Sequence, residues 1–128
     1  MLQKESWIYV TDNTNVRWVK IFHLYKGFNR KKTSENYFIK GSSRVVEPPR
    51  IEYKGFKYKY KIKGDIVRLL IVRTNRIKYL MHSVQIRFNQ NSGIIINKKN
   101  NVLSKYVQGP FLNNKKNKKI KMLFKITF

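Results

Sequence analysis

The side chains that could perform catalysis or hold a metal are few and scattered in this sequence. Six carboxylates and two histidines are spread over 128 residues, and there is no cysteine. They are Glu5, Asp12, Glu35, Glu47, Glu52, Asp65, His23 and His82. No two of them have the spacing of an acid–base pair or a metal-ligand motif, and no glycine-rich phosphate loop is present. We therefore expect no enzyme, no metal, no cofactor and no small-molecule substrate.

The individual acids and histidines have simpler interpretations. Asp12 and Asp65 lie in turn sequences, where an Asp side chain accepts hydrogen bonds from nearby backbone N–H groups. His23 lies in a predicted strand and is expected to pack in the core. His82 is expected to be a surface residue or an RNA contact.

Basic side chains dominate the chain instead. Twenty-nine Lys and Arg face only six acids, which gives a formal net charge of +23 and favours a polyanionic partner, above all a nucleic acid. Because no segment is neutral, a protein embedded in a large RNA is a better fit than one that touches a single duplex face. The candidate RNA-binding residues are Arg17, Lys20, Arg30, Lys31, Lys32, Arg44, Arg50, Lys54, Lys57, Lys59, Lys61, Lys63, Arg73, Arg76, Lys78, Arg87, Lys98, Lys99, Lys105, Lys115, Lys116, Lys118 and Lys119.

Two segments concentrate this charge. From 53 to 63, lysines are interleaved with Tyr and Phe, which offers phosphate contacts and stacking platforms together. Packing of these aromatic side chains on a neighbouring protein explains the pattern equally well. The second segment, 113–121, is the densest cationic run of the chain, and we favour RNA as its partner over a merely solvated run.

The elements that must position these side chains are mainly strands. β-branched and aromatic residues recur with period two, and turn signals separate short runs. The predicted strands are 7–10, 16–25, 37–47, 50–63, 66–73, 83–88, 93–96 and 122–128, with 83–88 and 93–96 forming a hairpin. Any helix is short and lies within 97–118. Many short strands at close spacing predict a small β-barrel.

Hydrophobic patterning gives a candidate core and a candidate arm. Eight residues on consecutive strands are expected to line the barrel: Ile66, Leu70, Val72, Val84, Ile86, Phe88, Ile94 and Ile96. Segment 50–63, with one cationic and one apolar face, is expected to extend from the barrel as a hairpin arm. The whole chain, 1–128, is expected to be a single domain with a basic C-terminal segment at about 97–128.

Composition also bears on origin. Lys, Asn, Ile, Tyr and Phe make up half of the chain and alanine is absent, which is the bias expected of an AT-rich genome such as an organelle's. No apolar run approaches the roughly 20 residues of a membrane span. The first residues resemble neither a secretory signal nor an amphipathic presequence, so a protein that works in an organelle is expected to be made there.

One part of the sequence is more specific than this general pattern. Residues 63–74 read Lys-Gly-Asp-Ile-Val-Arg-Leu-Leu-Ile-Val-Arg-Thr, and 83–88 read Ser-Val-Gln-Ile-Arg-Phe. They resemble the universal large-subunit ribosomal protein family numbered fourteen, which reads K-G-D-hydrophobic, a V-V-R-T strand end and G-S-hydrophobic-I-R-F. Residues 10–16 resemble the family's V-A-D-N-S-G-A, and Gly109-Pro110 matches its G-P.

The sequence departs from the family pattern at several positions. Asn15 and His82 stand where the family has glycine, and the 50–62 stretch is longer than the usual hairpin. The G-T-R before G-P appears only as 103–105, and R-E-L-R has become 112–116. These changes alter the C-terminal face, on which some members of the resembled family bind a subunit-silencing factor.

The resemblance implies a five-stranded closed β-barrel with a protruding hairpin and short C-terminal helical or loop elements. It implies a structural constituent of the large ribosomal subunit that binds large-subunit rRNA, touches neighbouring ribosomal proteins and helps form a bridge to small-subunit rRNA. With the compositional bias, it implies the mitochondrial matrix, with a plastid-type organelle as the alternative. The alternative function is an OB-like, single-stranded nucleic-acid binder outside the ribosome.

Overall fold

A computed structural model describes residues 2–27, 29–48, 60–104, 106–112 and 118–128. The strands are β1 (Leu2–Gln3), β2 (Trp7–Val10), β3 (Val16–His23), β4 (Lys32–Thr33), β5 (Phe38–Val46), β6 (Ile66–Arg73), β7 (Lys78–Tyr79), β8 (Gln85–Ile86) and β9 (Ser92–Ile96). A 3₁₀ turn spans Met81–Ser83, and helix α1 spans Lys118–Lys121. None of the helices in these ranges is long and apolar enough to cross a membrane.

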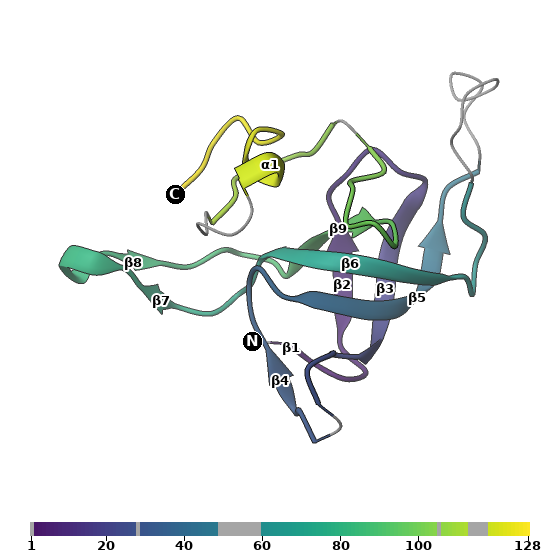
Figure 1. The fold of residues 1–128 in the computed structure, drawn as a ribbon, viewed down its shortest axis with the longest axis horizontal. Coiled ribbons are helices and arrows are strands. Elements are labelled where there is room, and N and C mark those ends of the chain that lie inside the picture. Colours follow the sequence, from purple (N-terminus) through teal and green to yellow (C-terminus); the bar gives the residue numbers. More distant parts are fainter. Residues whose placement is uncertain (1, 28, 49–59, 105, 113–117) are drawn as a thin grey trace.

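Five strands close into a barrel in the order β2-β3-β5-β6-β9 (Figure 1). All neighbours are antiparallel except β2 and β9, whose parallel pairing closes the barrel. The predicted mainly-β, closed-barrel fold is confirmed, and the bounds predicted for β2 and β6 agree with the structure.

The barrel interior follows from strand register, because residues paired across antiparallel strands share a face. Ile39 pairs with Leu69, and Leu69 pairs with Ile95. The same face continues around all five strands into one buried cluster. This barrel interior contains Leu2, Ile8, Val10, Val16, Val19, Ile21, Leu24, Ile39, Val67, Leu69, Ile71 and Ile95.

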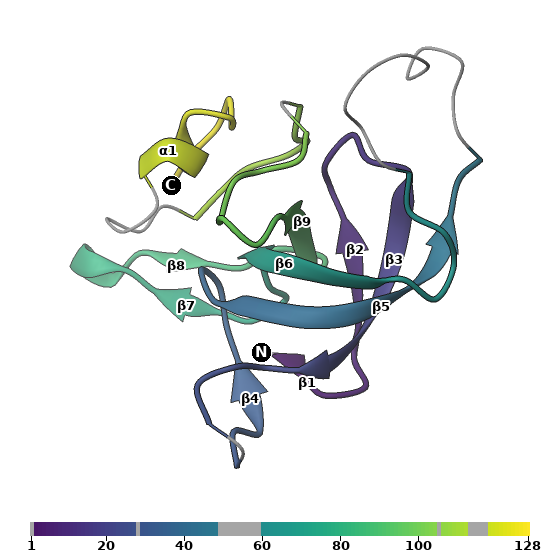
Figure 2. The same cartoon turned by 45° about the vertical axis from the view of Figure 1, so that its right-hand side comes forward.

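A second buried cluster lies outside the barrel wall, on the opposite face of β6 and β9. Leu70 pairs with Phe38 and with Ile94 on this outer face. The C-terminal segment covers it, with α1 on the same side of the barrel in both views (Figures 1 and 2). This outer cluster contains Leu70, Val72, Ile94, Ile96, Phe111, Ile120 and Phe124.

The predicted barrel lining was therefore wrong for all eight residues, none of which lies in the barrel interior. Leu70, Val72, Ile94 and Ile96 are buried, but in the outer cluster. Ile66 is 64% exposed at the open end of β6. The remaining three predicted residues, Val84, Ile86 and Phe88, lie outside both clusters, and Val84 is exposed. The four residues of the outer cluster were assigned to the wrong face because β6 and β9 both carry buried residues on both faces, so a hydrophobic run does not tell which face is inside.

A two-stranded ribbon formed by β7 and β8 projects from the barrel (Figures 1 and 2). The predicted hairpin between 83–88 and 93–96 is wrong, because β8 pairs with β7, whereas β9 pairs with β6 and β2. At the tip of this β7–β8 ribbon, His82 and Ser83 have left-handed φ angles of 63° and 61°. His82 stands where the family described in the sequence analysis has glycine, the residue that adopts a left-handed conformation most easily.

Segment 50–63 lies mostly outside the described residues. Within it, 60–62 form no regular structure and Lys63 begins a turn, so the strand predicted there is wrong over 60–63. The arm at 50–59 stays a prediction.

The predicted final strand, 122–128, is also wrong. Helix α1 ends at Lys121 and a turn follows, so the side chains do not alternate between two faces. Phe124 is buried, but Met122 is 85% exposed, and Ile126 and Phe128 are exposed. Phe111 holds this segment through backbone hydrogen bonds: its N–H donates to Ile126 O at 3.0 Å, and its carbonyl accepts from Phe128 N at 2.9 Å. The predicted short helix exists but begins at 118 rather than lying within 97–118.

Candidate nucleic-acid interface

Exposed cations lie on loops and strand ends all around the barrel. Of the candidate RNA-binding residues, Lys31, Lys32, Arg44, Lys63, Arg76, Lys78, Arg87, Lys98 and Lys99 are exposed. Arg17, Lys20, Arg30 and Lys61 are half-buried, and Arg73 is buried. Arg50, Lys54, Lys57, Lys59, Lys105, Lys115 and Lys116 lie outside the described residues, as do the side chains of Lys118 and Lys119.

Arg17 and Lys20 on β3 are engaged by acids of the same chain. Arg17 donates from Nε to Glu47 Oε1 at 2.6 Å and from Nη2 to Glu47 Oε2 at 2.8 Å, and its Nη1 donates to Thr14 O. The hydrogen bond to Glu47 raises the pKa of Arg17. Lys20 Nζ lies 2.5 Å from Glu5 Oε2, and this contact lowers the pKa of Glu5. These two cations are therefore less available to phosphate than the exposed ones.

Arg73 has a structural role that the sequence did not indicate. Its side chain is buried, and Nη1 donates to the carbonyls of Gln108 and Pro110, both at 2.9 Å. Gly109 between them has φ 83°, and a Cβ at that position would overlap the Arg73 guanidinium. Burial lowers the pKa of Arg73. We remove Arg73 from the candidate RNA contacts, because its guanidinium ties the end of β6 to the C-terminal segment.

The predicted turn aspartates are confirmed. Asp12 Oδ1 accepts from the N–H of Thr14 at 3.1 Å and from its hydroxyl, and Asp65 Oδ2 accepts from Ile62 N at 3.0 Å. Asp12 also accepts from Ile95 N at 2.8 Å through Oδ2, which joins the first turn to β9. Burial raises the pKa of Asp12. Asp12 and Asp65 therefore stabilise the turns in which they lie.

The histidines differ in outcome. His23 is exposed at the end of β3, with its ring edge-on to Tyr25 at 4.7 Å, so the prediction that it packs in the core is wrong. His82 is exposed on the tip of the β7–β8 ribbon, as the surface interpretation expected. Within the described ranges, no three His, Asp or Glu residues come close enough to hold a metal ion.

Sequence reasoning missed a cluster in which cations lie over aromatic rings. Lys26 and Arg30 lie over the Tyr37 ring, at 4.7 and 4.5 Å from its centroid. Arg68 lies 4.7 Å from the centroid of Phe38. These residues come from a turn, a loop, the start of β5 and the middle of β6, so no local spacing in the sequence could have indicated the cluster.

Fold and surface together define a class: small, strongly basic β-barrel proteins with exposed cations on several loops and strands. Within that class, the family model described as ribosomal protein L14p/L23e matches residues 1–127. The chain belongs to this family. It is accordingly a ribosomal protein of the large subunit, from a structural, non-enzymatic family.

The motifs behind the resemblance now have structural explanations. Gly64, in the Lys-Gly-Asp motif, has φ 94° in the turn before β6. Gly109-Pro110 forms the turn held by Arg73. Asn15, which stands where the family has glycine, holds residue 61 by two bonds: Nδ2 donates to Lys61 O at 2.6 Å, and Oδ1 accepts from Lys61 N at 3.2 Å. Asn15 thereby fixes the C-terminal end of the long 50–62 stretch to the barrel.

Proposed function

We propose that this protein binds large-subunit rRNA through cations on several sides of the barrel. The observation that carries the proposal is the placement of exposed Lys and Arg on well-separated elements: the 29–32 loop, β5, the β7–β8 ribbon and the 97–100 turn. With 29 cations against six acids, the charge has few partners within the chain. Contacts to phosphate on many sides suit a protein surrounded by folded RNA.

Salt dependence tests this proposal. The affinity of the purified protein for a large-subunit rRNA fragment should fall steeply with salt, because each neutralised phosphate adds roughly −0.7 to −0.9 to the log–log slope. The double variants Lys31→Gln/Lys32→Gln and Lys98→Gln/Lys99→Gln should each make the slope shallower by up to roughly two such increments. An affinity that barely changes between low and high salt would contradict the proposal.

We further propose that the β7–β8 ribbon contacts a neighbouring large-subunit protein. Its strands are only two residues long, and such an isolated pair is marginal in water. It nevertheless exposes Ile77, Tyr79, Met81 and Val84, and Tyr79 is 70% exposed. A partner that buries these side chains would stabilise the ribbon, while Arg76, Lys78 and Arg87 would remain for rRNA, including small-subunit rRNA at a bridge.

Subunit assembly tests the ribbon proposal. Replacing Tyr79 and Met81 with Ser should lower the occupancy of the protein in purified large subunits, because an apolar contact is lost. The matched control replaces two exposed apolar residues elsewhere, Trp7 and Phe22, with Ser. Equal occupancy of the ribbon variant and the wild type would refute the contact.

The compositional bias supports a mitochondrial ribosome, with the gene in the organelle's own genome. Mass spectrometry of ribosomes from purified mitochondria should detect the protein, and its mRNA should fractionate with organellar RNA. Sedimentation in Mg²⁺ separates this proposal from the alternative of a strand binder outside the ribosome. A ribosomal protein sediments with the large subunit, whereas moderate salt releases a strand binder.

A further inference from the structure

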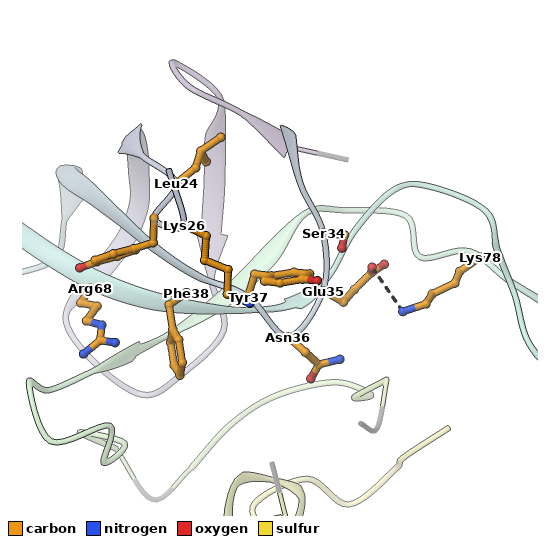
Figure 3. A pocket seen from close by; sticks show the side chains of 10 residues that line it. Leu24, Lys26, Ser34, Glu35, Asn36, Tyr37, Phe38, Arg68 and Lys78 are labelled. Atoms are coloured by element: carbon orange, nitrogen blue, oxygen red, sulfur yellow. Dashed lines mark ion pairs between the residues drawn. The ribbon is translucent and has the colours of Figure 1, made fainter. Parts of the chain in front are cut away.

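A cavity of about 440 Å³ opens on the outer wall of the barrel, between the turn after β3, the segment before β5 and the middle of β6. Its walls include Tyr25, together with Lys26, Tyr37, Phe38 and Arg68, which are labelled in Figure 3. Its volume lies within the range of sites that hold small organic ligands. Of the residues that line this aromatic–cation cavity, only Lys78 has a part in the functions proposed above.

Arg68 is the unusual group in this cavity. Its Nε is buried and has no hydrogen-bond partner among the residues that the structure describes. Instead, the guanidinium lies 4.7 Å from the Phe38 centroid and 5.4 Å from the Tyr25 centroid. A buried donor left without an acceptor is unfavourable, and few such groups occur in native proteins. The guanidinium therefore lies against aromatic rings, and its Nε has no acceptor within the described part of the chain.

The remaining charges around the cavity are also mostly positive. Lys26 lies over Tyr37, and Lys40 Nζ lies 5.9 Å from the Tyr25 centroid. Glu35 is the one carboxylate among the lining residues. It already accepts a hydrogen bond from the Thr74 hydroxyl and lies 4.0 Å from Lys78 Nζ. The cavity therefore combines aromatic rings with more positive than negative side chains.

We propose that this cavity binds one unpaired nucleotide of the RNA, with its phosphate on Arg68 and Lys26 and its base against the rings of Tyr25, Tyr37 and Phe38. A phosphate supplies the acceptors that Arg68 lacks, and charge-assisted bonds of this kind are the stronger ones. Aromatic side chains are the usual partners of bases removed from a helical stack. The inference rests on the RNA binding proposed above and gives it a specific point of contact.

The first test observes Arg68 directly. Its Nε–H resonance in the ¹⁵N-labelled protein is followed during titration with uridine 5′-monophosphate, inorganic phosphate and uridine, with Arg44 and Arg76 as exposed internal references. We expect the monophosphate to give a saturable shift at Arg68 and at the Tyr25 and Tyr37 rings. Phosphate alone should reach half-saturation only at a clearly higher concentration. Arg68 shifts no larger than those of Arg44, or equal affinity for phosphate and the monophosphate, would overturn the proposal.

The second test uses variants and two RNA probes, a single-stranded oligouridylate and a duplex of equal length. Arg68→Gln should weaken single-strand binding by roughly tenfold, and Tyr37→Leu by at least roughly fivefold, because a charged bond or a stacked base is lost. Arg44→Gln, which removes one charge elsewhere, should have a smaller effect, and the duplex should distinguish the variants little. Thermal unfolding checks that each variant folds. If Arg68→Gln does not fold, Tyr37→Leu still tests the proposal, because Tyr37 is not part of β6.

The outcomes separate this inference from the proposed function. If the wild type binds RNA with a steep salt dependence but Arg68→Gln and Tyr37→Leu behave like Arg44→Gln, the nucleotide site is refuted and rRNA binding stands. If the wild type does not bind rRNA at all, both proposals fail together.

Discussion

The barrel interior and the outer cluster share strands β6 and β9 but are closed in different ways. The interior is enclosed by five strands, and each strand is hydrogen-bonded through its backbone to both of its neighbours. The outer cluster is covered by the C-terminal segment, whose described residues form a four-residue helix and a few isolated bridges, such as Phe111 to Thr127. Its cover depends on side-chain packing, with the Phe111 and Phe124 rings stacked 4.7 Å apart.

This difference implies a hierarchy of stability. Opening the interior requires breaking the barrel, whereas the cover of the outer cluster can separate while the barrel stays closed. Regions with few ladder bonds generally open at lower free energy than the strands of a core. Single substitutions in the barrel interior and in the outer cluster can test this difference in stability.

The largest effect is expected inside the barrel. Ile71 is fully buried in the interior, so Ile71→Ala should lower the free energy of unfolding by about 4 kcal/mol through lost burial and a residual cavity. Urea denaturation measures it. Ile66→Ala on the same strand is the matched control and should change stability by less than about 0.5 kcal/mol, because Ile66 is exposed. Similar losses for the two variants would refute the assignment of faces on β6.

The next effect concerns the outer cluster. Phe124→Ala removes the ring stacked on Phe111 and should cost about 3 kcal/mol, the low end for a buried Phe, because the covering segment can rearrange locally. Hydrogen exchange should speed up at Phe111 and Phe128, whose backbone bonds hold the segment, and stay slow in β3 and β5. Uniform acceleration in both regions would mean that they open as one unit.

The connection between the two regions should contribute less. Arg73→Met keeps the volume of the stem but leaves the Gln108 and Pro110 carbonyls without their donor, at a cost of about 1–2 kcal/mol. Combined with Phe124→Ala, the losses should not add, because both variants release the same segment. Strict additivity in a double-mutant cycle would show that Arg73 and Phe124 act independently.

The smallest effect is a pH dependence at Asp12. Burial raises its pKa, so the native state binds this proton more tightly than the unfolded chain does. Protonation of Asp12 therefore contributes its whole stabilising free energy below the ordinary pKa of Asp. This contribution is lost as the pH rises through the raised native-state pKa of Asp12. The free energy of unfolding of the wild type should therefore fall, relative to that of Asp12→Asn, across that window. Parallel curves for the two proteins would exclude the raised pKa.

The local sequence pattern predicted the barrel fold and several of its features. Alternation and turn signals located β2 and β6 to the residue, because each has a clear period or a bounded apolar run. The motif residues around 63–74 and 83–88 indicated the family, and the turn roles of Asp12 and Asp65 followed from side-chain chemistry alone. The period-two pattern at 122–128 gave a wrong prediction. Its apolar residues lie two apart in sequence, but the segment comes after helix α1 and a turn and does not form a strand.

The sequence by itself determined the class of fold, the polyanionic character of the expected partner and the family, because these depend on composition, period and short motifs. Only the tertiary structure decided which face of β6 and β9 is the barrel interior, since both faces are apolar and the choice depends on which segments cover them. It alone separated Arg73, which holds the C-terminal segment, from the exposed cations. It alone brought Arg68 against Phe38 and Tyr25, because contacts between residues distant in sequence follow from barrel closure, not from local spacing.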